Sequence, residues 1–504
     1  MRKLLLGIDI GTSSCKAAVF DLEGNIIGQS TKDYSVYYPS PDYVEQDPRE
    51  WWGGVRDAIK EILSAGNIKP EEIAGIGVDG QSWSAIPVDK DGEVLHNTPI
   101  WMDTRSSEIT KKTIDRVGVD KIFEISGNSF EPTYSTPKMI WFKETNPEIY
   151  KNTYMFLQSN SYIIFKLTDK YTQDVSQGYG IHSFNMKTGK WEDDFCEELG
   201  ISREKLPEIY KCHEVIGEVT LRASKETGLA AGTPVVAGGL DACCGTLGAG
   251  VVDVGQTQEQ GGQAGGMSIC LDQPLAHPKL ILSFHVIPDL WLLQGGTVGG
   301  GGCINWFKKE LAGFEIEEGR KNGKDIFKIM DEEASTISEG ADGLIFLPYM
   351  AGERSPLWDK HAKGVFFGLS YNKTRAHMIR SVLEGTAFAL EHNLKTASEI
   401  GVNVNELNAM GGAANSRLWT QIKSDVTGKI INVPASDTAT TLGAAILAGV
   451  GVGLYKNFKE AVKNTIKINR IHEPNMEKNK IYIKYYEIYI ELYEKLKGTM
   501  SKIS

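Results

Sequence analysis

Two segments of the chain place a carboxylate directly beside a glycine-rich turn. In residues 7–16 (GIDIGTSSCK), Asp9 ends an apolar run, and Gly11, Thr12 and Ser13 follow it. Such a turn can direct backbone N–H groups and hydroxyls at phosphate oxygens, and Asp9 could hold Mg²⁺ directly or through water. The spacing matches neither the dinucleotide-binding nor the P-loop pattern. An ordinary hairpin turn is the structural alternative.

The second segment is 235–245 (VVAGGLDACCG), in which an apolar run and two glycines precede Asp241. An isolated carboxylate at this position suits a general base that takes the proton of a substrate hydroxyl. A helix N-cap is the equally simple alternative. Two further clusters of small residues, 299–302 and 410–416, would let a phosphate or a flat ring approach the backbone.

The elements that must position these residues follow a strand-and-helix pattern. Apolar runs at 3–10, 15–21 and 26–29, separated by turns, predict an antiparallel meander. Residues 47–65 predict a helix, with an aspartate N-cap, a proline at the first position and apolar residues every four positions. A strand is expected at 73–79. The combination predicts an α/β or α+β domain.

A second series of elements follows residue 250. We expect strands at 261–271, 280–286, 291–295, 405–410 and 430–433, and helices at 303–312, 323–337, 374–400 and 475–497. The last helix carries an aromatic stripe, which indicates core packing rather than a ligand face. The two halves are alike in plan, so the sequence predicts two similar α/β domains with a cleft between them, and such clefts often bind ligands.

Bulk composition excludes several classes of protein. The 504 residues carry a net charge of −11, the opposite sign to that of a generally basic nucleic-acid binder. Seven cysteines without a CxxC pair argue against a disulfide scaffold or a zinc ribbon. The long uncharged segments 290–307 and 438–455 are broken by glycines, so neither predicts a membrane span. We therefore expect a cytoplasmic protein without nucleic-acid or membrane partners.

Several longer motifs resemble the FGGY family of carbohydrate kinases, which belongs to the actin-like ATPase superfamily. They are residues 364–369 (GVFFGL) with 377–384 (HMIRSVLE), 138–144 (KMIWFKE) and 352–356 (GERSP). Residues 43–48 (YVEQDP), the tryptophan pair 51–52 and residues 100–105 (IWMDTR) resemble the xylulokinase branch of that family.

The resemblance implies an α/β fold with two actin-like (ribonuclease H-like) ATPase domains and a central cleft. Residues 1–246 would form the sugar-binding domain with the catalytic base, and residues 247–504 the nucleotide-binding domain. The implied activity is ATP-dependent phosphorylation of a primary hydroxyl of a small ketose, D-xylulose first. Alternatives are another ketose or polyol (ribulose, L-xylulose, erythrulose or a glycerol-like substrate), a sugar-binding regulator with a degraded phosphate site, or an ATP-gated switch. ATP and Mg²⁺ would be the cofactors, and a homodimer is common in the family.

The resemblance also implies roles for individual residues. Asp241 would be the catalytic base, and Asp9 and Asp241 would lie at the metal. The ATP-binding residues would be Asp9, Gly11, Thr12, Ser13, Lys16, Gly262, Gln263, Gly300, Gly411, Gly412, Ala413 and Asn415. The sugar-binding residues would be Gln81, Ser82, Trp83, Asp103 and Asp241.

The chain departs from the family pattern at two places. Trp83 stands where xylulokinases usually have a histidine that faces the ketose, which changes the size and polarity of the pocket. Gln263 and Ala264 stand where the family usually has threonine and serine beside the phosphates, and Glu259 interrupts a strand that should be apolar. We expect a remodelled phosphate or sugar site.

Overall fold

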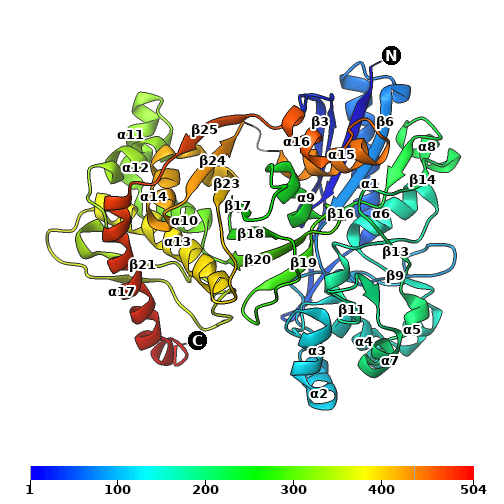
Figure 1. The fold of residues 1–504 in the computed structure, drawn as a ribbon, viewed down its shortest axis with the longest axis horizontal. Coiled ribbons are helices and arrows are strands. Elements are labelled where there is room, and N and C mark those ends of the chain that lie inside the picture. The colour runs from blue at the N-terminus through cyan, green and yellow to red at the C-terminus, as the bar shows by residue number, and fades with distance from the viewer. Residues whose placement is uncertain (1, 436–437, 504) are drawn as a thin grey trace. The chain divides into compact units, whose positions relative to one another are not determined.

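The computed structural model describes residues 2–435 and 438–503, which form two compact units (Figure 1). Unit 1 comprises the described residues up to 252 together with 270–292 and 438–466. Unit 2 comprises the described residues of 253–269, 293–437 and 467–504. This division differs from the contiguous one expected at residues 246 and 247, because residues 247–252, 270–292 and 438–466 of the expected C-terminal half belong to unit 1.

Unit 1 is built on a mixed sheet with the strand order β14-β15-β6-β1-β2-β3, and β16 also pairs with β6. The meander β1-β2-β3 is antiparallel, as predicted, whereas β6 runs parallel to β1. The strands of this sheet are β1 Leu4–Ile10, β2 Ser14–Phe20, β3 Ile26–Asp33, β6 Ile73–Gly80, β14 Val215–Glu218, β15 Pro234–Val236 and β16 Gly239–Leu240.

Helices and short strands complete unit 1. The helices are α1 Pro48–Ala65, α2 Ser107–Val117, α3 Val119–Ser126, α4 Ser135–Thr145, α5 Pro147–Asn152, α6 Ser159–Thr168, α7 Asp193–Leu199, α8 Leu221–Thr227, α9 Asp241–Gly248, α15 Ala439–Gly451 and α16 Phe458–Thr465. The short strands are β4 Tyr37–Ser40, β5 Tyr43–Gln46, β7 Ile86–Val88, β8 Thr98–Pro99, β9 Met155–Leu157, β10 Gln173–Asp174, β11 Phe184–Asn185, β12 Lys190–Trp191, β13 Ile209–Tyr210 and β19 Ile281–Phe284. The predicted helix at 47–65 is confirmed as α1, and the Asp47 carboxylate caps it by accepting from the N–H of Arg49.

Helix α15 explains why unit 1 is discontinuous in sequence. It lies beside the strands β1 and β6 (orange against blue in Figure 1) and makes extensive contacts with both. The approach requires glycine, because a Cβ on Gly7 would lie 1.9 Å from the carbonyl oxygen of Thr441, and one on Gly77 would lie 1.9 Å from that of Ala444. Gly7 belongs to the segment 7–16 that the sequence singled out for its phosphate turn, and the structure gives it a role in helix packing.

Unit 2 contains six strands of a second mixed sheet, in the order β20-β18-β17-β23-β24-β25, and β19 continues that sheet beyond β20. Its strands are β17 Gln256–Gly261, β18 Gly265–Leu271, β20 Trp291–Thr297, β23 Glu406–Met410, β24 Ile430–Pro434 and β25 Ile468–His472, with a separate hairpin of β21 Ile345–Leu347 and β22 Val365–Phe367. Its helices are α10 Gly301–Leu311, α11 Gly313–Asn322, α12 Ile326–Ser335, α13 Arg375–Ser398, α14 Arg417–Thr427 and α17 Met476–Met500.

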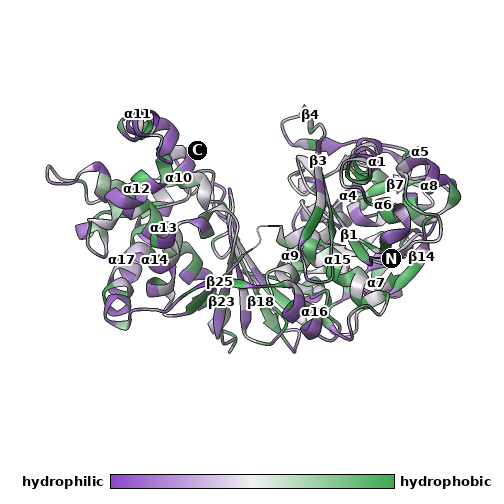
Figure 2. Cartoon of the chain, turned by 90° about the horizontal axis from the view of Figure 1, so that it is seen from above, coloured by the Kyte–Doolittle hydropathy of each residue, from purple (hydrophilic) through white to green (hydrophobic). Residues whose placement is uncertain are grey.

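One expectation for unit 2 was wrong, and helices α11 and α14 were not predicted. Residues 261–271 are not one strand, because a turn at 262–264 separates β17 from β18. Helix α11 was missed because it is predominantly hydrophilic (Figure 2) and therefore lacks an apolar period. The aromatic stripe of α17 is confirmed as core: Tyr482, Tyr489 and Tyr493 are buried in the cluster that fills this unit.

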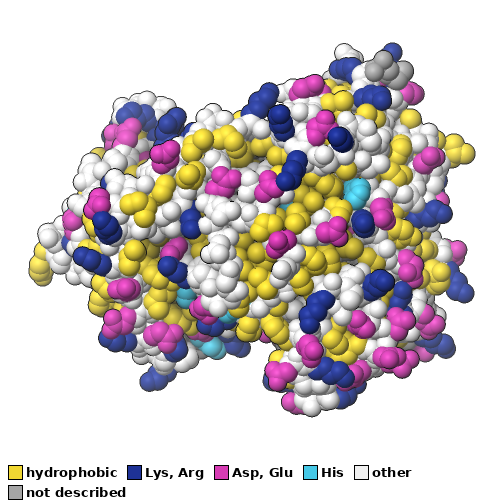
Figure 3. All heavy atoms as spheres, in the orientation of Figure 1, with side chains coloured by type: hydrophobic (Ala, Val, Ile, Leu, Met, Phe, Trp, Pro, Cys, Tyr) yellow, Lys and Arg dark blue, Asp and Glu magenta, His cyan; other side chains and the backbone are white. Residues whose placement is uncertain are grey.

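The distribution of surface charge and the burial of the cysteines are those of an ordinary globular protein. Lys and Arg side chains are interspersed with Asp and Glu over the face drawn in Figure 3. All seven cysteines are buried. Among the described residues, no helix combines the length and the apolar character needed to cross a membrane.

Candidate active site

Three carboxylates meet at one edge of the sheet in unit 1. Strands β1 and β6 are parallel and in a register that pairs Asp9 with Asp79, and β16 pairs Gly239 with Asp79. Asp241 follows β16 directly as the first residue of α9. Ligand sites in open α/β sheets form at the carboxyl ends of parallel strands, which is where these three side chains lie.

Burial raises the pKa of all three carboxyl groups, and the charge of Asp9 further raises those of Asp79 and Asp241. Burial raises the pKa of Asp9, and the Lys16 ammonium on β2 partly offsets this effect. The pKa of Asp79 lies well above its usual value because of burial and then the charges of Asp9 and Asp241. Burial and the Asp9 charge raise the pKa of Asp241 to about 7, although the Ala242 N–H donates to its Oδ1 at 2.6 Å.

Asp79 is fully buried, and neither of its carboxyl oxygens has a donor among the described groups apart from the Asp9 carboxyl. A proton shared between Asp9 and Asp79 removes their mutual repulsion. The predicted site did not include Asp79. A signal was present in the sequence, because Gly-Val-Asp at 77–79 repeats the Gly-Ile-Asp pattern at 7–9.

The turn after β1 is held by several side chains. The N–H of Gly11 donates to the carbonyl oxygen of Ser14 at 3.1 Å, and the Tyr34 hydroxyl donates to the carbonyl oxygen of Gly11. The Thr12 hydroxyl accepts from Trp101 Nε1 at 2.9 Å, whereas Ser13 is exposed. These contacts fix the turn that was predicted to meet phosphate.

The structure brings the predicted phosphate turn and part of the predicted sugar site together. The Thr12 hydroxyl lies 3.5 Å from Gln81 Oε1. Gln81 is buried, and its amide donates to Gln46 Oε1 at 2.7 Å. The Ser159 hydroxyl donates to the carbonyl oxygen of Gln81 at 2.7 Å, so the residue is held from both sides.

Trp83 has an unusual backbone and an unsatisfied donor. Its φ of 62° lies in the left-handed region that bulky residues rarely adopt. The indole stacks on Tyr134, with ring centroids 4.1 Å apart, and its buried Nε1–H has no acceptor among the described groups. The ring centroid of Tyr179 lies 5.9 Å from that of the indole, and the Tyr179 side chain hydrogen-bonds to Ser82. Burial and, to a smaller extent, the charge of Asp241 raise the pKa of Tyr179. Strain and an orphaned donor both concentrate at functional sites.

A buried lysine holds Trp83 in this conformation. Lys138 is fully buried, and its ammonium donates to the carbonyl oxygens of Trp83 at 2.9 Å, Ile100 at 2.7 Å and Thr133 at 2.5 Å. These three bonds use all of its donors. Lys138 belongs to the family motif at 138–144, but it was not predicted to serve the sugar site.

Asp103, another predicted sugar-binding residue, is engaged in a buried ion-pair network. Its carboxylate accepts from Arg105 Nε at 2.9 Å and Nη2 at 2.7 Å, and from the N–H of Val44 at 2.7 Å. Arg105 also pairs with Glu45 at 2.7 Å and lies 3.9 Å from the ring centroid of Tyr43. The network gives Asp103 a structural role, because both of its oxygens already accept charge-assisted bonds.

Unit 2 contains a pocket of about 440 Å³, and most of the predicted nucleotide residues of that unit line it. Gly262, Gln263, Gly412, Ala413 and Asn415 are the predicted residues in its walls. Residues that the sequence did not indicate complete the lining, among them Ile304, Asn305, Asp325, Phe327, Asp331, Leu383 and Trp419. Apolar walls with a few polar groups suit a flat heterocycle.

Two predicted residues lie beside this pocket. Gly300 lines an adjoining small cavity together with Gly265 and Gly299. Gly411 has a φ of 85°, and a Cβ there would lie 2.8 Å from the carbonyl oxygen of Gly261, so a turn and a close approach both require glycine.

The first amides of helix α10 are already used. The N–H of Gly301 donates to the carbonyl oxygen of Gly262 at 2.7 Å, and that of Gly302 donates to the carbonyl oxygen of Gln263 at 2.8 Å. The glycine cluster therefore anchors the turn at 262–264. Glu353, from the GERSP motif, holds the segment that leads into α10, because its Oε1 accepts from the Val298 N–H at 2.6 Å.

The comparisons with known proteins agree with this geometry. The N-terminal domain model of the FGGY family of carbohydrate kinases matches residues 4–248, and its C-terminal domain model matches residues 269–452. The chain belongs to the FGGY family of carbohydrate kinases. It is therefore an ATP-dependent sugar kinase with the two-domain, mixed α/β fold of the actin-like ATPases.

The individual relatives include kinases with different named substrates. A xylulose kinase of Staphylococcus epidermidis is 31% identical over 99% of this chain and 98% of its own length. A gluconokinase of Bacillus licheniformis is 28% identical over 100% of this chain and 98% of its own length. The crystal structure of a ligand-bound xylulose kinase from Lactobacillus acidophilus matches with a TM-score of 0.91 and 26% identity, covering both chains completely.

Proposed function

We propose that this kinase phosphorylates a primary hydroxyl of a small ketose, with D-xylulose as the first candidate substrate and D-xylulose 5-phosphate as the product. The observation that carries the proposal is Asp241, a carboxylate at the start of α9 whose pKa is raised to about 7. A general base works best when its pKa lies near the working pH. The named xylulose kinases among the relatives support the choice of sugar.

In the proposed reaction, the substrate hydroxyl oxygen attacks the γ-phosphorus of ATP, and the bond from that phosphorus to the β,γ-bridging oxygen breaks. ADP leaves with the electron pair of the broken bond, and the hydroxyl proton passes to Asp241. Thr12 and Ser13 would donate to phosphate oxygens. Unit 1 would supply the sugar site and the base, and the 440 Å³ pocket of unit 2 would take the nucleoside.

The carboxylate cluster fits a divalent cation. Mg²⁺ takes one or two carboxylates and completes its shell with water and substrate phosphates, and Asp9 and Asp241 could serve as those two carboxylates. Such a cation would offset the charge of Asp9, which raises the pKa of Asp79 and of Asp241. The ion would supply charge neutralisation at the phosphates.

The aromatic wall at Trp83 supports a specificity that differs from that of typical xylulokinases. Its orphaned Nε1–H needs an acceptor, which a sugar hydroxyl or carbonyl oxygen can provide. Another ketose, such as ribulose, L-xylulose or erythrulose, or a polyol is therefore the alternative substrate.

A coupled assay of ADP release with the purified protein tests the proposal. The panel contains D-xylulose, the three other ketoses, glycerol and gluconate, since a gluconokinase is among the relatives. We expect the highest kcat/KM with D-xylulose or another ketose, and a loss of at least about 100-fold in turnover for Asp241→Ala. Sugar-dependent ADP release that survives this substitution would show that Asp241 is not the base.

The family match disfavours the sugar-binding regulator, which the sequence had suggested because Gln263 and Ala264 lack the hydroxyls that the family places at the phosphates. Calorimetry that detected sugar binding without nucleotide binding would support it. A homodimer and a cytoplasmic location remain expectations from the family resemblance, and a sizing measurement tests the first.

A further inference from the structure

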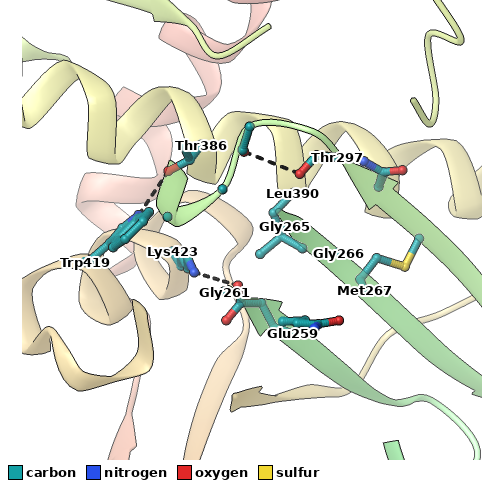
Figure 4. A pocket seen from close by; sticks show the side chains of 15 residues that line it. Glu259, Gly261, Gly265, Gly266, Met267, Thr297, Thr386, Leu390, Trp419 and Lys423 are labelled. Atoms are coloured by element: carbon teal, nitrogen blue, oxygen red, sulfur yellow. Dashed lines mark hydrogen bonds and ion pairs between the residues drawn. The ribbon is translucent and has the colours of Figure 1, made fainter. Parts of the chain in front are cut away.

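The anomalous strand at the head of unit 2 contains a buried ion pair. Glu259 lies on β17, and its Oε1 accepts from Lys423 Nζ on α14 at 2.5 Å (Figure 4). The side chains are only 4% and 5% exposed. Lys423 thus accounts for a glutamate inside a sheet, since a buried charge persists only when it is paired.

The pair joins two segments that each contribute residues to the lining of the 440 Å³ pocket of unit 2. Strand β17 leads directly into the turn at Gly261 and Gly262, which lines the pocket. Helix α14 carries Trp419, which also lines the pocket, and Lys423 Nζ lies 4.8 Å from the centroid of that indole. Figure 4 shows Lys423 between Trp419 and Glu259.

The close packing around the pair leaves the turn little freedom. A Cβ on Gly261 would lie 2.4 Å from the Cβ of Ala413 and 3.2 Å from Lys423 Nζ. Trp419 is fixed in turn, because its Nε1 donates to Thr386 Oγ1 at 3.0 Å (Figure 4). A displacement of Lys423 would therefore move both the glycine turn and the indole.

Direct binding of phosphate by Lys423 does not fit this arrangement. The ammonium is buried, its charge is balanced by Glu259, and Lys423 is not among the described residues that line the nucleotide pocket. Glu259 also lines a cavity of about 20 Å³, which is large enough for one water. A water there would give a donor to Glu259 Oε2, which has no partner among the described residues.

We propose that the Glu259–Lys423 ion pair is a positioning device that sets the spacing of the glycine turn and the Trp419 helix for nucleotide binding. The inference rests on the proposed function, because it assumes that the pocket of unit 2 takes the nucleoside of ATP. It gives the remodelled strand a role in nucleotide affinity rather than in sugar recognition.

Calorimetric titrations with ADP and with the preferred sugar test the proposal. Lys423→Met leaves an unpaired buried carboxylate, and we expect it to weaken ADP binding at least tenfold while sugar affinity stays within twofold. Glu259→Gln preserves the shape and should weaken ADP binding three- to tenfold, which provides a readout if Lys423→Met does not fold. The double variant Glu259→Leu/Lys423→Met removes both charges and should recover ADP affinity to within threefold, because well-packed apolar pairs can replace buried ion pairs.

A matched control is the buried pair of Arg380 and Glu384 on α13, whose side chains are 5% and 2% exposed. Glu384→Gln should lower the melting temperature but leave ADP affinity within twofold. ADP affinity within twofold of wild type in Glu259→Gln, equal losses for ADP and sugar, or no recovery in the double variant would each overturn the proposal. Failure of the wild-type protein to bind ADP would instead overturn the proposed function.

Discussion

Asp241→Asn should abolish phosphoryl transfer and, at the same time, stabilise the protein at alkaline pH in the absence of metal and nucleotide. Asparagine keeps the shape of the side chain but carries no charge into the carboxylate cluster. The charge of Asp9 makes a charge at Asp241 unfavourable. A charge at Asp241 in turn raises the pKa of Asp79. A residue that serves chemistry at a cost in stability is a common feature of active sites.

The magnitude follows from the pKa of Asp241, which is about 7 in the folded protein against an ordinary value of 3.8. Between these values the folded state holds a proton that the unfolded state has lost, so stability falls as the pH rises from about 4 to about 7. A difference of about three pH units corresponds to ~4 kcal/mol at full effect. Because the side chain is partly exposed, we expect about half of this, ~2 kcal/mol, at pH 8.

Urea unfolding at pH 5 and pH 8, in buffer with a chelator, measures the effect. At pH 5 less than half of the penalty has developed, so the advantage of Asp241→Asn should be more than twice as large at pH 8 as at pH 5. Asp91→Asn, at an exposed aspartate, is the control and should change stability by no more than about 0.5 kcal/mol at either pH. An advantage that is equal at both pH values, or a variant less stable than wild type at pH 8, would refute the electrostatic reasoning.

Three further substitutions and one control test specificity and packing in unit 1. Trp83→His should change the ranking of sugars by kcat/KM, and an unchanged profile in the coupled assay would mean that Trp83 does not set specificity. Lys138→Met removes the donors of three buried carbonyl groups, and urea unfolding should show a loss of at least about 3 kcal/mol; a loss below 1 kcal/mol would contradict its positioning role. Gly7→Ala places a Cβ 1.9 Å from the Thr441 carbonyl oxygen and should cost about 3 kcal/mol. Gly53→Ala, inside α1 with no atom within 4 Å of the new Cβ, should instead be neutral or stabilising by up to about 1 kcal/mol.

The sequence predicted those features of the site that depend on local order along the chain. Asp9 and Asp241 were found because each comes at the end of an apolar strand beside glycine, and α1 was found from its cap and its period. Asp79 was missed because its importance arises from the pairing of β6 with β1, and its local signal was limited to a Gly-Val-Asp tripeptide that resembles residues 7–9. Asp103 was assigned to the sugar site from the family resemblance, whereas the bonds that it accepts from Arg105 cannot be deduced from a spacing of two residues.

Long-range packing was the other feature that the sequence did not reveal. The segment 438–455 was interpreted only as an uncharged stretch broken by glycines, although it contains the helix that covers β1 and β6. Its glycines and those of the strands fit one another, and this complementarity is visible only when the two segments are side by side.

The return of α15 to the first strands has a consequence for biosynthesis. Every residue of β1 is buried in the finished protein, yet the helix that contributes to this burial is made only after residue 438. A nascent chain must therefore hold the apolar face of its first strands uncovered while most of the protein is synthesised. Those strands form a surface that chaperones can recognise, and truncation before α15 should give an aggregating fragment rather than a folded unit.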